Sequence, residues 1–124
     1  MNALGRHILV DLYDCDADLL DDLDYVAQHM ERAARAAGAT ILNATFHPFS
    51  PHGVTGVLAI QESHLAIHTW PEYRFAAVDL FTCGEGIDPW KAHKVIKEAL
   101  KAGHDAAVEM PRGHAGLLDV PNPT

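Results

Sequence analysis

The sequence predicts an α/β domain of the α+β type, a two-layer sandwich in which two helices cover one face of an antiparallel sheet. Short runs of β-branched and aromatic residues between turn residues are typical of strands, and two longer segments repeat apolar residues at helical spacing. The strands expected at 54–61 and 73–81 are apolar at nearly every position, which implies that both sheet faces are covered. Because the helices can cover only one face, we expect a dimer with an α/β/β/α four-layer assembly.

Strands are expected where β-branched and aromatic residues cluster between turn residues. The clearest runs are His7–Tyr13, Ala39–Phe46, Val54–Gln61 and Tyr73–Phe81, with a short last strand at Asp105–Met110. A further run, Ser63–Trp70, would pair with the strand after it as a hairpin around Pro71. The three prolines and two glycines of Pro111–Thr124 predict a loop or loose tail.

Two helices are expected between these strands. The first follows the turn Asp14–Asp16, whose carboxylates can cap it, and it ends at Gly38, a residue typical of helix C-termini. The second follows Asp88, has Pro89 at its first position and ends at Gly103. In each segment the apolar residues recur every three or four positions, which predicts one buried stripe.

Composition and charge argue against several classes of function. The 124 residues suit one domain, and 48% apolar with 21% charged residues is typical of a globular protein. A formal charge of −8 argues against nucleic-acid binding, which requires clustered Lys and Arg. No segment approaches the roughly 18 apolar residues of a membrane span, and the first residues lack the layout of a secretory signal. We therefore expect a cytoplasmic protein without nucleic-acid or membrane partners, in which Cys15 and Cys83 stay thiols.

The residues best suited to chemistry lie between Glu62 and Gly84. They could support three different chemistries. The first is a zinc site at His64, His68 and Glu72, although their four-residue spacing is most diagnostic on a helix, which Thr69-Trp70-Pro71 argues against. The second is a nucleophilic thiol activated by a histidine.

The third chemistry is cleavage of the chain between Glu62 and Ser63. A serine hydroxyl can attack the preceding carbonyl carbon and turn the peptide bond into an ester. Base-catalysed β-elimination then leaves a dehydroalanine, which hydrolyses to a pyruvoyl group. Hairpin pairing would bring Ser63, at the start of one strand, to the same sheet edge as Cys83, at the end of the next. Composition and spacing alone leave the three chemistries open.

A family resemblance favours the third chemistry. The chain closely resembles the prokaryotic S-adenosylmethionine decarboxylase proenzymes in the run Glu-Ser-His-Leu-Ala-Ile-His-Thr-Trp-Pro-Glu-Tyr, Glu62–Tyr73, and in its continuation Ala76–Gly84. Shorter matching segments are Leu4–His7, Gly38–Thr40, Thr45–His47 with Phe49, and Asp88–Ala92. Most of the chain is therefore covered, and the central run is long enough to be highly specific.

The resemblance implies a pyruvoyl-dependent decarboxylase made as a zymogen. It implies one domain, 1–124, that cuts itself into a β chain, 1–62, and an α chain, 63–124, headed by a pyruvoyl group made from Ser63. That group forms a Schiff base with the substrate amine and accepts the electrons released as carbon dioxide leaves. The implied reaction is decarboxylation of S-adenosylmethionine to the aminopropyl donor for spermidine and polyamine biosynthesis. The implied assembly is a homodimer with active sites shared at or near its interface.

The resemblance also implies roles for individual side chains and requires no metal. His68 matches the processing residue of the family, and Cys83 matches the proton donor of the decarboxylation. Phe49 matches an aromatic residue that stacks on adenine, and Glu72 a carboxylate that holds the ribose hydroxyls. Thr55, where relatives often have serine, keeps a hydroxyl at a substrate-binding position.

One position departs from the family pattern. Arg74-Phe75 replaces a Gly-Tyr pair of close relatives, and an arginine that pointed into the pocket would disfavour a cationic substrate. Arginine or ornithine are then alternative substrates for the same pyruvoyl chemistry. A non-catalytic relative, either metal-binding or regulatory, is the alternative of a different class.

Overall fold

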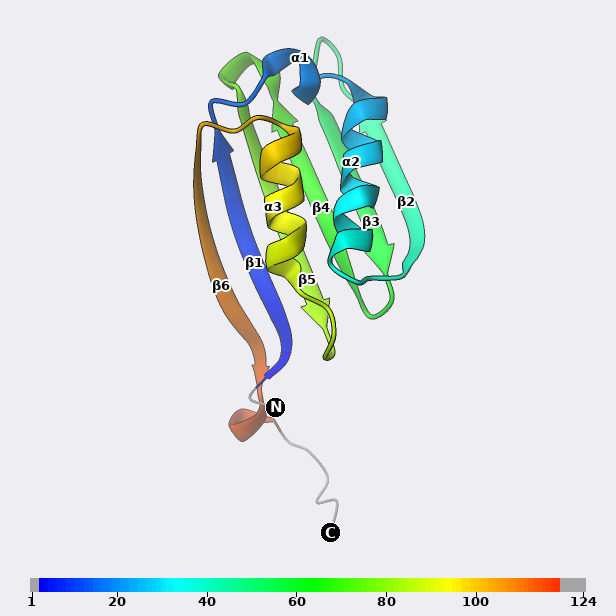
Figure 1. The fold of residues 1–124 in the computed structure, drawn as a ribbon, viewed down its shortest axis with the longest axis vertical. Coiled ribbons are helices and arrows are strands. Elements are labelled where there is room, and N and C mark those ends of the chain that lie inside the picture. The colour runs from blue at the N-terminus through cyan, green and yellow to red at the C-terminus, as the bar shows by residue number, and fades with distance from the viewer. Residues whose placement is uncertain (1–2, 119–124) are drawn as a thin grey trace.

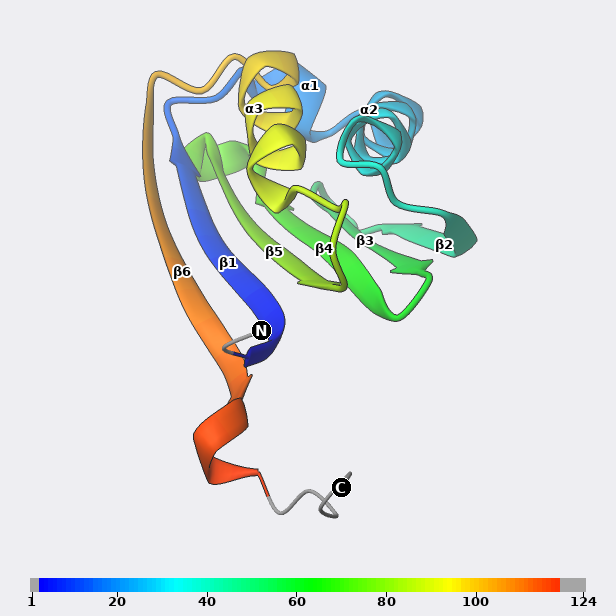
Figure 2. The ribbon, with the colours of Figure 1, turned by 60° about the horizontal axis from the view of Figure 1, so that its bottom comes forward.

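The computed structural model describes residues 3–118, which form a six-stranded antiparallel sheet with helices on one face (Figure 1). The strands are β1 (Ala3–Tyr13), β2 (Ile41–Pro48), β3 (Val54–Ile60), β4 (Ser63–Trp70), β5 (Phe75–Cys83) and β6 (His104–His114), in the order β2-β3-β4-β5-β1-β6. The helices are α1 (Ala17–Leu20), α2 (Leu23–Ala36) and α3 (Pro89–Ala99). Figure 2 shows α2 and α3 on the same side of the sheet. The predicted α+β class and antiparallel sheet are confirmed.

The first predicted helix is in fact two helices, because an aspartate caps the start of each one. Asp16 accepts backbone N–H groups at the start of α1, and Asp22 accepts the N–H of Tyr25 at the start of α2. Between them, the Asp21 carboxylate accepts the N–H of Gly53 at 2.8 Å and so ties the β2–β3 loop to this corner. No helix within residues 3–118 combines the length and the apolar character needed to cross a membrane.

The last strand is longer than predicted. β6 runs to His114, whose partner on β1 is Ala3, so the prediction of a loop from Pro111 is wrong for the end of this strand. Proline is tolerated there because β6 is an edge strand, where a missing N–H can face away from the ladder. A 3-10 turn covers Ala115–Leu117, and the tail predicted for 119–124 lies outside the described residues.

Alternation along the strands separates a buried sheet face from an open one. The buried face packs against α2 and α3 through apolar side chains, among them Ile8, Val10, Leu12, Leu65, Ile67, Val78 and Leu80 from the sheet and Val26, Met30, Ile96 and Leu100 from the helices. The open face carries exposed apolar residues: Leu9, Val57, Trp70, Val108 and Met110. Within residues 3–118, α2 and α3 leave this second face without a covering layer (Figure 2).

The central hairpin forms as predicted. β4 and β5 pair antiparallel, with Trp70 opposite Phe75. The turn between them is a 3-10 helix, Pro71–Tyr73, closed by Arg74 in the left-handed conformation with φ of 54°. β5 therefore begins two residues later than the predicted strand, because the residues before it are needed to reverse the chain.

Thr69 is a buried polar residue at the junction of three elements. Its hydroxyl donates to the carbonyl of Leu20 at 2.8 Å and accepts the backbone N–H of Val54, also at 2.8 Å. One side chain thereby joins β4, β3 and α1.

Replacing Thr69 by valine should lower the free energy of unfolding by about 2 kcal/mol, because two buried backbone groups lose their partner. The measurement is urea unfolding, made on chains that also carry S63A so that each is a single polypeptide. T69S keeps the hydroxyl and should retain most of the stability. Equal losses in the two variants would contradict this role of the hydroxyl.

Candidate active site

The peptide bond expected to break lies in the tight turn between β3 and β4. Glu62 has φ of 76°, a left-handed conformation that is unfavourable for a residue with a side chain. Ser63 begins β4, and its hydroxyl donates to the carbonyl oxygen of Glu62 at 2.5 Å. The hydroxyl therefore lies beside the carbonyl group that it would attack.

Cys83, the last residue of β5, lies at the same point. Its sulfur is 3.1 Å from the hydroxyl oxygen of Ser63. Gly5 pairs with Cys83 from β1 and keeps this place open, since a Cβ there would lie 3.3 Å from the sulfur and 2.9 Å from the Phe81 ring. Cys15, by contrast, is fully buried elsewhere, and burial raises the pKa of its thiol to about 11. Cys83 is therefore the thiol available for chemistry.

A cluster of rings and one guanidinium surrounds this end of the open face. His64 stacks on Phe81 with ring centroids 5.7 Å apart, and the Arg112 guanidinium lies 5.5 Å from the centre of the same ring. Arg112 also contacts Nδ1 of His7 at 2.9 Å, and burial lowers the pKa of that imidazole. The sequence gives no signal for this cluster, because Arg112 reaches it only through the extension of β6.

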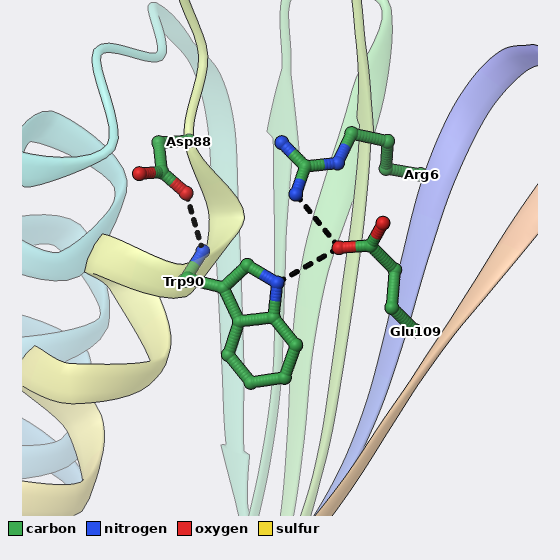
Figure 3. Close-up of polar contacts among 4 residues, drawn as sticks. All are labelled: Arg6, Asp88, Trp90 and Glu109. Carbon is green, nitrogen blue, oxygen red and sulfur yellow. Dashed lines mark hydrogen bonds and ion pairs between the residues drawn. The ribbon is translucent and has the colours of Figure 1, made fainter. Parts of the chain in front are cut away.

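A polar cluster lies on the helix-covered face of β1 and β6 (Figure 3). Glu109 of β6 accepts hydrogen bonds from Arg6 of β1 at 2.7 Å and from the Trp90 ring N–H at 2.8 Å. The hydrogen bond from Arg6 holds the pKa of the Glu109 carboxyl below its usual range. Asp88 caps α3 by accepting the N–H of Trp90 at 3.0 Å. These contacts fix β1, and with it Gly5, against α3 and β6.

The other candidate residues line a groove of about 340 Å³ near the far end of β4. Its lining includes Phe49, His52, Thr55, His68, Trp70 and Glu72. The Thr55 hydroxyl oxygen and His68 Nδ1 are 3.0 Å apart, and Nε2 of His52 lies 2.9 Å from Oε2 of Glu72. All the residues expected to bind substrate therefore share one surface with His68.

The residues around Ser63 and Cys83 form one group, and the groove that contains His68 forms a second. These two groups are too far apart to act together within one chain. Ser63 and His68 are five residues apart on one strand, which corresponds to about 16 Å. The register agrees, since Cys83 pairs with Gly5 at one end of the sheet and His68 pairs with Thr55 further along. The alternative of a zinc site gains no support: among residues 3–118, no three His, Cys, Asp or Glu side chains are grouped so as to hold a metal ion.

Arg74, the departure from the family pattern, is bound outside the groove. Its Nε donates to the carbonyl of Cys15 at 2.7 Å, and its own carbonyl accepts the N–H of Cys15 at 3.0 Å. These contacts tie the β4–β5 turn to the connection after β1, and Arg74 does not line the groove. Its charge therefore gives no argument against a cationic substrate.

Comparisons with known proteins cover almost the whole chain. A profile of the S-adenosylmethionine decarboxylase family matches residues 6–113. The S-adenosylmethionine decarboxylase proenzymes of Thermotoga petrophila and Thermotoga maritima are each 52% identical over 121 residues, covering 98% of this chain and 93% of each relative. That of Acidithiobacillus ferrooxidans is 51% identical, covering 98% and 91%. The crystal structure of the adenosylmethionine decarboxylase from Aquifex aeolicus superposes with a TM-score of 0.88 at 35% identity, covering 98% of this chain and 99% of that chain.

The fold and these matches show that the chain is an enzyme, a decarboxylase built on an antiparallel sheet. The particular family follows from the extent of the match. The chain belongs to the S-adenosylmethionine decarboxylase family. The predicted family is thereby confirmed.

Gly5→Ala should reduce decarboxylase turnover about tenfold, because the added methyl group displaces the Phe81 ring and crowds the Cys83 sulfur. The measurement is the kcat of the purified variant. Gly103→Ala is the matched control, since its Cβ meets the side chain of Asp14 at 3.1 Å, away from the sulfur. A wild-type kcat in the Gly5 variant would show that the open space is not needed.

Proposed function

We propose that the chain is the zymogen of a pyruvoyl-dependent enzyme that decarboxylates S-adenosylmethionine and supplies the aminopropyl donor for polyamine biosynthesis. The observation that carries the proposal is the position of the Ser63 hydroxyl, between the carbonyl of Glu62 and the sulfur of Cys83. Membership of the family supports the substrate. The matched relatives are named proenzymes, which agrees with a self-processing step.

Self-processing begins at the strained turn. The Ser63 oxygen attacks the carbonyl carbon of Glu62, the peptide nitrogen takes up the hydroxyl proton, and an ester replaces the peptide bond. A base then removes the Cα proton of Ser63, and the carboxylate of Glu62 leaves. The remaining dehydroalanine takes up water and loses ammonia, which gives a pyruvoyl group at the head of residues 63–124. Cleavage relieves the left-handed backbone of Glu62, so the turn favours this sequence of steps.

The surroundings of Ser63 fit a pyruvoyl group and its chemistry. A pyruvoyl group supplies an electron sink for decarboxylation, the role that pyridoxal phosphate has in other enzymes. Ser63 lies at a strand end, and Gly5 keeps the adjacent surface free of a side chain. The thiol of Cys83 is in contact with the Ser63 side chain and delivers its proton to the α-carbon of the substrate after carbon dioxide leaves. That role requires a neutral thiol.

The groove supplies the binding surface for the nucleoside part of the substrate. Phe49 is half exposed and offers a ring face to the adenine. Glu72 accepts the ribose hydroxyls, and the pair formed by Thr55 and His68 lies on the same surface. The net charge of −8 suits a substrate that carries a sulfonium cation.

A second copy of the chain completes each site in this proposal. Two sheets stacked face to face lie about 10 Å apart, a distance that catalytic side chains can bridge from both sides. If the open faces pack about a twofold axis that runs across β4 between Ser63 and His68, the groove of one chain covers Ser63 and Cys83 of the other. The exposed apolar residues of the open face, such as Leu9, Val108 and Met110, are then buried between the sheets. This gives the α/β/β/α assembly.

The purified chain should appear in denaturing mass spectrometry as two fragments, residues 1–62 and a pyruvoyl-headed 63–124. Ser63→Ala should stay whole, because alanine lacks the attacking hydroxyl. Cys83→Ala should still be cut but should release carbon dioxide from S-adenosylmethionine about a hundredfold more slowly, since it lacks the proton donor.

Assays with S-adenosylmethionine, arginine and ornithine side by side test the substrate. Release of carbon dioxide from the first alone is expected. An uncut wild-type chain, or faster turnover of either amino acid, would contradict the proposal.

A further inference from the structure

We propose that His52 is a positioning residue that holds the Glu72 carboxylate ready for the ribose hydroxyls of the substrate. The inference rests on the proposed function, because it takes Glu72 as the group that binds the nucleoside. It assigns a role to a histidine that the self-processing and decarboxylation steps do not use.

The loop that carries His52 is fixed on both sides. The next residue, Gly53, donates its N–H to the Asp21 carboxylate at 2.8 Å, and its carbonyl accepts the N–H of Phe49 at 2.8 Å. The loop therefore presents Nε2 of His52 to Oε2 of Glu72 at 2.9 Å from a restrained backbone.

The contact prepares Glu72 for a ligand without occupying it fully. His52 contacts Oε2 alone, which leaves Oε1 to accept a hydroxyl. The two side chains are 34% and 40% exposed, so a ligand in the groove can reach them. A free glutamate loses rotamer freedom when it binds, and His52 has already removed that freedom before the substrate arrives.

The test compares processed wild-type enzyme with H52L and H52Q. Two quantities are measured: the KM for S-adenosylmethionine, and the Kd for 5′-methylthioadenosine by calorimetry. H52L should raise both about fivefold and leave kcat nearly unchanged, because Glu72 loses the exposed contact that orients it before binding. H52Q keeps an N–H donor and should bind nearly as well as wild type.

H104Q is the matched control, because His104 lies 3.5 Å from Asp14 in an exposed pair that does not line the groove. It should behave as wild type. Unchanged KM and Kd in H52L, or an equal loss of affinity in H52Q, would overturn the role of His52. Failure of the wild-type enzyme to release carbon dioxide from S-adenosylmethionine would instead contradict the proposed function, and the nucleoside Kd would still decide on His52.

Discussion

The stiffness of β4 is the constraint on which the rest of the site depends. An extended strand cannot shorten, so Ser63 and His68 stay about 16 Å apart. Each end of the strand collects its own partners: Cys83 and Gly5 lie at the first, and Thr55 lies at the second. One chain therefore presents two incomplete groups of reactive and binding side chains near the two ends of β4, although together they contain every residue that the proposed chemistry uses.

The open face of the sheet is where a second chain could pack and bring the two groups together. α2 and α3 cover one face of the sheet (Figure 2). The other face exposes apolar side chains such as Leu9 and Val108. Exposed apolar surface of this kind is typical of protein interfaces. In the proposed dimer, the packing that buries these residues also brings the groove of one chain over the Ser63 end of the other. Stability and catalysis would then require the same contact.

Much of the fold could be predicted from the sequence, because its signals are local. Alternation and turn residues predict the β4–β5 hairpin, and with it the approach of Ser63 to Cys83. One helix is predicted where the structure has α1 and α2, because apolar residues continue at helical spacing past the aspartate that caps α2. The extension of β6 past Pro111 depends on pairing with β1, which no local pattern reports. The contact between His52 and Glu72 likewise joins segments that only the folded sheet brings together.

The claim that each active site takes Cys83 from one chain and Glu72 from its partner can be tested by mixing two inactive variants. C83A and E72A chains are assembled together, and decarboxylation of dilute S-adenosylmethionine is measured. Half of the dimers in a random mixture are hybrids, and each hybrid contains one site with both residues intact. About a quarter of wild-type activity should therefore return. No return of activity, in a mixture shown by native mass spectrometry to contain hybrid dimers, would contradict the claim.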